Sequence, residues 1–223
     1  MVNKNVIRFE FTKKEGLKYI SHLDLQRTVA RIIKRSGIPI RYTEGFNPHP
    51  KMVFGLPLSV GCESECELLD VYMIFDEKRP GEPLYTPEEF KRDIVPNLPV
   101  GLDFVTAFYP EKSFSDIKSA KYKVSIELND TNNICEDIKN ALNSPMVVTK
   151  KTKAGPKEVD ISPLIFDYSI ELQDKNLFLK LELSAAQNEF LNPEYVMTGL
   201  KNDDRISSKI EYYTVMRKAI VFK

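Results

Sequence analysis

Residues 21–61 read SHLDLQRTVARIIKRSGIPIRYTEGFNPHPKMVFGLPLSVG, and this stretch sets the pattern from which the fold is predicted. Ser21 is suited to cap a helix, with Asp24 at the third helical position in a variant of the capping box that has Asp in place of Glu. Apolar residues then recur at helical spacing: Leu25, Val29, Ile32 and Ile33. Gly37 can end the helix in a left-handed conformation, and Pro39 prevents its continuation. The stretch therefore predicts one amphipathic helix followed by extended chain.

Strand and helix patterns on both sides of this helix extend the prediction to the whole chain. The first half is expected to hold, besides the helix after Ser21, a second helix from Thr86 to before Pro96. Its strands are expected at 6–12, 38–43, 66–75 and 102–109, with extended chain at 52–58. After a polar linker at 110–119, the second half is expected to hold helices at 134–142 and from Asn192, and strands at 121–128, 146–150, 159–161, 165–172, 177–184 and 206–222.

The element order β-α-β-β-α-β is the ferredoxin-like pattern. We therefore predict an α+β fold made of two tandem ferredoxin-like halves with antiparallel sheets, residues 1–110 and 118–223.

Length and composition are those of an ordinary soluble globular protein. The 223 residues are 42% hydrophobic and 29% charged, and no apolar run approaches the roughly 18 residues that a membrane span needs. The N-terminal residues enter a strand pattern directly and lack the apolar core of a signal peptide, so a cytoplasmic protein without membrane attachment is expected.

The three cysteines indicate neither a disulfide framework nor a metal site. Cys62 and Cys66 have a C-x3-C spacing, but position 69, where an iron–sulfur cluster for radical chemistry would need a third cysteine, is Leu69. Cys135 stands alone, so a second pair of zinc ligands is missing. No cofactor is expected in this chain by itself.

Charge is segregated along the chain although the formal net charge is zero. Between Phe11 and Gly55, nine basic residues stand against three acidic ones, whereas thirteen acidic residues stand against five basic ones from Gly61 to Ile117. In the basic segment, Arg27, Arg31 and Arg35 recur every four residues and line one side of the helix. This row fits a solvated face and an anion-binding face, and a local basic face is compatible with a nucleic-acid partner.

The loop 44–51 is the strongest candidate for a rigid binding element. Its prolines fix the backbone around Phe46, Asn47 and His49, and Arg41 precedes it in a predicted strand. Aromatic side chains expected near the basic helix are Tyr19, Tyr42 and Phe46. An exposed ring in a loop can stack on an RNA base, and Phe46 is the best placed of the three for that role.

A second basic feature lies in the other half, where 145–157 carries no acidic residue. Its lysines are Lys150, Lys151, Lys153 and Lys157. A loop of this kind suits contact with a phosphate backbone, and it equally suits any exposed hairpin tip.

His22, Asp24 and His49 are the candidates for acid–base chemistry. His22 and Asp24 lie two residues apart at a helix start, so their side chains are expected to diverge. If the loop 44–51 folds back over the helix N-terminus, His49 meets His22 and forms a phosphate-binding corner with an arginine. Asp160, in a strand-like run, is interpreted as a local hydrogen-bond acceptor, a partner for a lysine or a catalytic group.

Several of these runs together resemble the uncharacterised radical-SAM-linked proteins, which contain a domain of unknown function. The resemblance rests on Ser21-His22-Leu23-Asp24 with Arg27 and Arg31, on Gly45-Phe46-Asn47-Pro48-His49-Pro50, on Leu56-Pro57-Leu58 and, more weakly, on Lys157-Glu158-Val159-Asp160-Ile161. Members are fused to a radical SAM protein or encoded beside one. The resemblance implies such a protein as partner, with RNA modification as the process served.

Three functions remain open. The leading hypothesis is an RNA-binding accessory protein that presents substrate to a radical SAM partner and has no catalytic activity alone. Its expected RNA contacts are Arg27, Arg31, Arg35, Arg41, Phe46, Asn47, His49, Lys150, Lys151 and Lys153. The alternatives are a metal-independent RNA-processing or RNA-modifying enzyme that uses His22, Asp24 and His49, and a protein-interaction module whose acidic segment 61–117 docks a basic partner.

Overall fold

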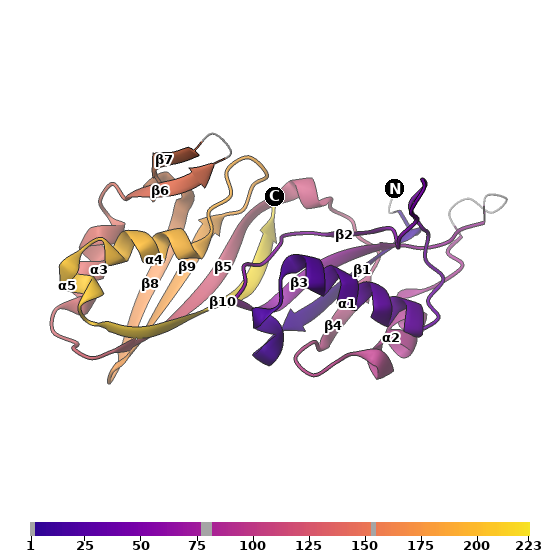
Figure 1. Ribbon diagram of the computed structural model, residues 1–223, viewed down its shortest axis with the longest axis horizontal. Coiled ribbons are helices and arrows are strands. Elements are labelled where there is room, and N and C mark those ends of the chain that lie inside the picture. Colours follow the sequence, from indigo (N-terminus) through magenta and orange to yellow (C-terminus); the bar gives the residue numbers. More distant parts are fainter. Residues whose placement is uncertain (1–2, 77–81, 153–154) are drawn as a thin grey trace. The chain divides into compact units, whose positions relative to one another are not determined.

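The computed structural model describes residues 3–76, 82–152 and 155–223, apart from the side chains of residues 151 and 152 (Figure 1). The chain divides into two compact units, Met1–Phe114 and Ser115–Lys223. The strands within each unit pair antiparallel and are accompanied by helices, so the predicted α+β class with antiparallel sheets is confirmed.

Unit 1 follows the order β-α-β-β-α-β. Its elements are β1 (Val6–Lys13), η1 (Glu15–Tyr19), α1 (His22–Arg35), β2 (Met52–Phe54), β3 (Glu63–Tyr72), α2 (Pro87–Ile94), η2 (Val95–Asn97) and β4 (Phe104–Phe108). The strands run in the order β4-β1-β3, and β2 also pairs with β3. The short helix η3 (Phe114–Asp116) contains the boundary between the units.

The core of unit 1 lies between its two helices and one face of its sheet (Figure 1). Helix α1 begins and ends as predicted: the Ser21 side chain accepts a hydrogen bond from the Asp24 N–H, and Gly37 follows with a φ of +68°. The predicted stripe on α1 is buried: Leu25, Val29, Ile32 and Ile33. Phe9 of β1 packs with ring centroids 4.9 Å from Phe11 and 5.5 Å from Phe90 of α2.

The opposite face of β1 is buried as well, and it carries an ion pair. Arg8 is the cross-strand partner of Asp70 on β3, and its Nε and Nη2 donate to the two carboxylate oxygens at 2.6 and 2.8 Å. The side chains of Arg8 and Asp70 are only 3% and 12% exposed. The Phe114 ring covers the guanidinium, with its centroid 4.0 Å from Arg8 Cζ.

Unit 2 is built around a four-stranded sheet and one separate hairpin. Its elements are β5 (Ile117–Leu128), α3 (Ile134–Leu142), β6 (Val147–Thr152), β7 (Gly155–Asp160), η4 (Ser162–Leu164), β8 (Ile165–Gln173), β9 (Asn176–Ser184), α4 (Pro193–Lys201), α5 (Asp204–Ser207) and β10 (Ile210–Phe222). The strands of the main sheet run in the order β10-β5-β9-β8, and β6 pairs only with β7. Figure 1 shows α3 and α4 on one face of this sheet.

Two expected strands and one expected loop differ from the structure. Residues 38–43 make only isolated bridges, Ile40 to Met73 and Tyr42 to Pro50, because proline has no N–H for a continuous ladder. The expected strand from 206 begins only at Ile210, since the Asp203 side chain caps α5 by accepting from the Arg205 N–H. The expected lysine loop 151–157 is largely hairpin, as β6 and β7 leave only 153–154 between them, outside the described residues.

Among the described residues, no helix is long and apolar enough to cross a membrane. The longest helix, α1, has 14 residues, well short of the roughly 20 that a span requires.

The buried pair predicts an asymmetric response to mutation. Asp70→Asn leaves the Arg8 charge buried without its counterion, so the free energy of unfolding should fall by about 3–5 kcal/mol. The matched control is Glu65→Gln. It removes a carboxylate of β3 that lies 3.7 Å from the Lys14 ammonium, and the side chains of this pair are each about one third exposed. The free energy of unfolding should therefore fall by no more than about 1 kcal/mol. Urea unfolding measures both, and equal losses in the two variants would contradict the importance of the buried pair.

Candidate nucleic-acid interface

His22 lies in the first turn of α1, against the core. Its ring is edge-on to Phe54, with centroids 5.0 Å apart, and its Nε2 lies 2.9 Å from the amide nitrogen of Gln26. An amide nitrogen can only donate, so in this arrangement Nε2 accepts and the ring proton resides on Nδ1. The imidazole is therefore fixed by its neighbours.

Two buried charged residues of the sheet act on His22. Lys13 is 1% exposed and Glu67 is 2% exposed, and both interact electrostatically with the imidazole. Burial lowers the pKa of His22, while the Glu67 carboxylate opposes that shift and the Lys13 ammonium adds to it. Neither Lys13 nor Glu67 was predicted from the sequence to contribute to the site. Glu67 lies inside an otherwise apolar strand pattern, which is the signal that could have found it, whereas Lys13 lies in a polar run.

Asp24 does not belong to this cluster. It is exposed, accepts a hydrogen bond from the Ser21 hydroxyl at 2.7 Å, and pairs with Arg27 at 3.4 Å. The Ser21 hydrogen bond is the main reason that the pKa of Asp24 is lowered, and Arg27 adds to that effect. The expected divergence of His22 and Asp24 is what the structure shows.

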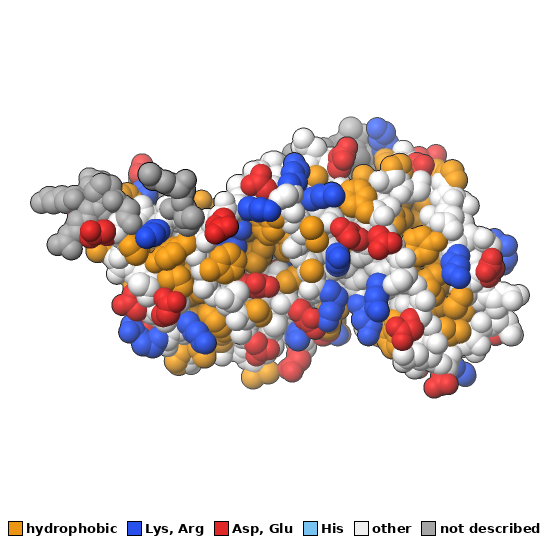
Figure 2. Space-filling view, turned by 180° about the vertical axis from the view of Figure 1, so that it is seen from behind, with side chains coloured by type: hydrophobic (Ala, Val, Ile, Leu, Met, Phe, Trp, Pro, Cys, Tyr) orange, Lys and Arg blue, Asp and Glu red, His pale blue; other side chains and the backbone are white. Residues whose placement is uncertain are grey.

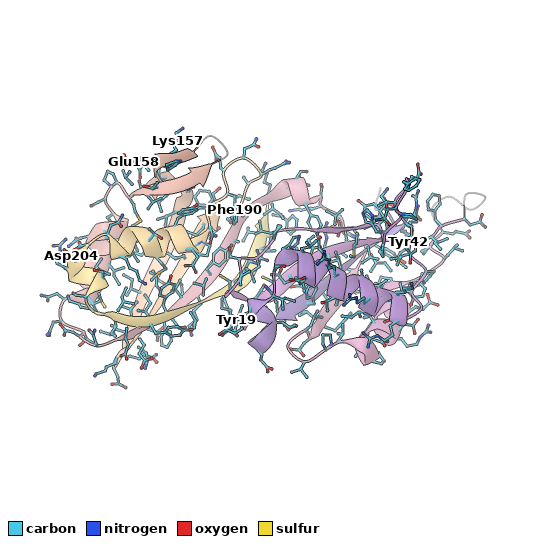
Figure 3. All side chains as sticks on the ribbon, in the orientation of Figure 1. Tyr19, Tyr42, Lys157, Glu158, Phe190 and Asp204 are labelled. Atoms are coloured by element: carbon cyan, nitrogen blue, oxygen red, sulfur yellow. The ribbon has the colours of Figure 1, made fainter. Side chains whose placement is uncertain are left out.

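His49 lies at the other end of α1 from His22. Its Nδ1 is 3.2 Å from both the Thr43 hydroxyl and the Asn47 carbonyl oxygen, and its N–H donates to Thr43 Oγ1. Figure 3 shows Tyr42, next to Thr43, and Tyr19, just before α1, at opposite ends of the helix. A helix of 14 residues is about 20 Å long.

The expected corner of His22, His49 and an arginine is therefore not formed. Pairing between Tyr42 and Pro50 holds the loop 44–51 beside the chain that leaves α1, away from the helix N-terminus. The imidazoles consequently have no shared proton-transfer site, which would require hydrogen-bond reach.

The segment after α1 gathers aromatic and basic side chains. We call the set Arg41, Tyr42, Phe46, Asn47, His49 and Lys51 the aromatic–basic edge. The Arg41 guanidinium lies 5.0 Å from the Phe75 ring centroid, and the Lys51 ammonium lies 4.9 Å from that of Tyr72. Phe46 is fully exposed, and Asn47 and His49 are exposed beside it.

The basic row on α1 leads into this edge. Arg27, Arg31 and Arg35 are all exposed, and Arg27 alone of the three has a described ion pair, with Asp24. Arg35 ends the helix, and Gly37 and Pro39 then turn the chain toward Arg41.

The charge segregation seen in the sequence is partly cancelled in space. Acidic side chains of β3 pair with basic side chains of β1 and η1: Glu63 with Lys18 at 3.4 Å, Glu65 with Lys14 at 3.7 Å and Asp70 with Arg8. These pairs do not involve the basic residues of α1 or of the aromatic–basic edge, which therefore carry most of the remaining positive charge of residues 11–55.

The lysine-rich stretch of unit 2 does not form the expected flexible loop. Lys150 is half-buried in β6, with its ammonium 5.2 Å from the Tyr195 ring centroid of α4, and burial lowers its pKa. The side chain of Lys151 and all of Lys153 lie outside the described residues. Lys157 is exposed on β7 (Figure 3).

Asp160 has a local structural role. Its Oδ1 accepts hydrogen bonds from the Met146 N–H at 3.0 Å, the Ser162 N–H at 3.0 Å and the Ser162 hydroxyl at 2.6 Å. These bonds close the β6–β7 hairpin and lower the pKa of the carboxyl group, with the Ser162 hydroxyl as the main cause. They fit the interpretation of Asp160 as a local acceptor.

In the described ranges, no group of three or more His, Cys, Asp or Glu side chains is placed to hold a metal ion. Cys62 and Cys66 are buried at the start of β3.

Comparison with known sequences places the chain in a family. Residues 6–193 match the family described as an uncharacterized protein conserved in bacteria (DUF2344), which covers most of the chain. The chain belongs to this family. No curated protein matches the sequence of this DUF2344 member.

Comparison with solved structures gives matches at low sequence identity. A crystal structure of a Cbf5-Nop10-Gar1 complex matches 97% of the chain at 9% identity with a TM-score of 0.50, and the DUF2344 chain spans about half (49%) of that chain. An unknown protein from Galdieria sulphuraria matches 97% of the chain at 11% identity, covering 98% of that protein, with a TM-score of 0.26. The acetolactate synthase small subunit from Thermotoga maritima matches 98% at 8% identity, covering 96% of the subunit, with a TM-score of 0.24.

The His22 environment predicts a pH-dependent stability. The folded-state pKa of His22 is lowered below the ordinary value near 6.5, so the unfolded chain binds the proton more readily. The contribution of His22 to stability is therefore complete above that value and decreases as the pH falls below it. His22→Gln should remove this decrease, as measured by urea unfolding at pH 7.5 and 5.5.

His49→Gln is the matched control, because His49 is exposed. Burial raises the pKa of Glu10, so its contribution to stability increases as the pH falls toward 4.5, opposite to that of His22. Because Glu10 is present in every variant, it does not affect the comparison between them. The interpretation is wrong if His22 titrates above 6.5 by NMR, or if His49→Gln alone abolishes the dependence.

Proposed function

We propose that this DUF2344 protein is an RNA-binding accessory protein and that the aromatic–basic edge contacts single-stranded RNA. The observation that carries the proposal is Phe46, a fully exposed aromatic ring in a loop that also contains Pro48 and Pro50. Burying such a ring in the chain's own core would be more stable by about 1.5–3 kcal/mol. A ring kept in solvent on a stiff loop is suited to stacking against a base.

The cations around Phe46 supply the second element of the interface. Arg41 and Lys51 lie over the rings of Phe75 and Tyr72, which limits their freedom without neutralising their charge. Arg31 and Arg35 add exposed charge on the adjoining helix. Phosphates of a bound strand would contact these cations, while bases stack on Phe46 and Tyr42.

The architecture supports the same proposal. We infer that the two units are tandem variants of one ferredoxin-like plan: the order β10-β5-β9-β8 in unit 2 corresponds to β4-β1-β3-β2 in unit 1, with β6–β7 as an insertion. Sheets with this plan leave one face open unless another element covers it. Several single-stranded RNA-binding domains use such a face.

We further propose that the RNA is presented to a radical SAM enzyme. The support is the resemblance carried by Ser21–Asp24 and Gly45–Pro50. The chemistry then belongs to the partner, and this chain supplies substrate binding. The enzyme alternative based on His22, Asp24 and His49 has no corresponding geometry, because the two histidines lie at opposite ends of α1.

RNA binding is predicted to depend on Phe46 and on salt. With a short labelled single-stranded RNA of mixed sequence, Phe46→Ala should weaken binding roughly 5- to 100-fold, the loss expected for one stacked base. Arg41→Ala should reduce the slope of log affinity against log salt concentration by about 0.7, the value for one phosphate contact. Fluorescence anisotropy across a salt series measures both quantities.

The controls are Phe190→Ala and Arg92→Ala, which remove an exposed ring and an exposed guanidinium outside the edge. Affinity unchanged in Phe46→Ala, or reduced equally in Phe190→Ala, contradicts the assignment of the edge. No binding at low salt rejects the RNA proposal as a whole.

The partner proposal predicts co-purification. The chain, tagged in its own host, should retain a radical SAM protein together with RNA that crosslinks to both proteins. Phe46→Ala should reduce the recovered RNA but leave the protein partner bound. If the retained proteins contain no radical SAM enzyme, the partner proposal fails while RNA binding stands on its own test.

A further inference from the structure

The outer face of the unit 2 sheet carries a concentration of lysines that the proposed edge does not use. Strand alternation puts Tyr122, Val124 and Ile126 of β5 into the core, so Lys121 and Lys123 point to the other face. In Figure 2, viewed from behind Figure 1, basic side chains stand among acidic and hydrophobic ones.

The register places like charges directly opposite each other. Lys123 of β5 is the cross-strand partner of Lys180 of β9, and these are the two central strands of the sheet. Directly opposed like charges destabilise an antiparallel pair. This cost is removed if an anion bridges the two ammonium groups.

A cavity of about 370 Å³ lies over this pair. It is lined by residues 121–123 of β5, 167–169 of β8, 180–182 of β9 and Lys218 of β10. The charged groups of the lining are four lysines and two carboxylates, Asp167 and Glu182. The lining therefore has a net positive charge, and the carboxylates of Asp167 and Glu182 provide hydrogen-bond acceptors.

The existing contacts of these lysines are weak enough to be exchanged. Lys121 lies 3.7 Å from Glu182, and Lys180 lies 3.8 Å from Glu171, with both lysine side chains more than half exposed. Exposed pairs of this kind contribute between about 0 and 1 kcal/mol. The Lys123 ammonium is held 4.0 Å from the Phe178 ring centroid, beside its partner Lys180.

We propose that this cavity binds one nucleotide of single-stranded RNA, with a phosphate between Lys123 and Lys180. The carboxylates of Asp167 and Glu182 accept hydrogen bonds from exocyclic amino groups of the base. The inference rests on the proposed RNA-binding function and adds a second contact, remote in sequence from the aromatic–basic edge.

Charge favours RNA over an acidic peptide as the occupant. An acidic peptide would place its carboxylates against Asp167 and Glu182, which are cross-strand partners and already repel each other. A nucleotide has a negative end and a donor-bearing end, and both fit the mixed lining. Peptide binding is kept as an outcome of the test.

The test uses the full chain, a short labelled single-stranded RNA of mixed sequence, and the double variant Lys123→Gln/Lys180→Gln. Affinity should fall roughly tenfold, and the salt slope should drop by about 1.4, the value for two phosphate contacts. The control is Lys139→Gln/Lys175→Gln, which removes the same charge from exposed positions in unit 2 and should change neither quantity. Thermal unfolding of the double variant should be unchanged or higher, because a repulsive pair is lost.

Crosslinking with peptide mapping separates this inference from the proposed function. RNA crosslinks in both 41–51 and 178–182 support both sites. Crosslinks confined to 41–51, or an unaltered affinity of the lysine double variant, overturn the cavity site and leave the edge intact. Crosslinks confined to 178–182 contradict RNA binding by the aromatic–basic edge and support the cavity site. The cavity proposal is overturned if no RNA binds. It is also overturned if an acidic peptide binds at 178–182 more tightly than RNA.

Discussion

The antiparallel register of β1 on β3 is the constraint on which unit 1 depends. It sets Arg8 opposite Asp70 in a two-bond ion pair that is almost wholly buried, and a shift by one residue would leave both charges without partners. The same register puts Glu67 opposite Phe11, on the side of the sheet that α1 covers, which is why a carboxylate acts on His22. The burial of the Arg8–Asp70 pair and the effect of Glu67 on the pKa of His22 therefore both result from one strand register.

That register also decides where positive charge remains. Because β3 pairs Glu65 with Lys14 and Glu63 with Lys18, two lysines in the first part of the basic segment are neutralised within unit 1. The arginines of α1 are exposed, and no described ion pair joins them or the cations after the helix to a carboxylate of β3. The acidic residues of β3 therefore form ion pairs within unit 1, although the sequence suggested that they belong to a surface for a basic partner. The exposed basic surface is smaller than the sequence indicates.

Features set by neighbouring residues were predictable from the sequence, and features set by distant pairing were not. The cap at Ser21 and the buried stripe of α1 follow from local rules. The burial of Arg8 required knowledge of its partner 62 residues away. The separation of His22 from His49 followed from the Tyr42–Pro50 bridge, and no spacing in the sequence encodes that bridge.

The central strands of the two units solve the same electrostatic problem in opposite ways. In unit 1 the outer face pairs Arg8 with Asp70, and the Phe114 ring covers the guanidinium, so that face needs no external ligand. In unit 2 the central strands β5 and β9 pair Lys123 with Lys180 and leave an open cavity above them. In an opposite-charge pair each group neutralises the other, whereas the repulsion in a like-charge pair of lysines is relieved when an anion binds between them. If RNA supplies that anion, the unit with the like-charge pair is the one whose sheet face binds the ligand, and unit 1 contributes through its edge.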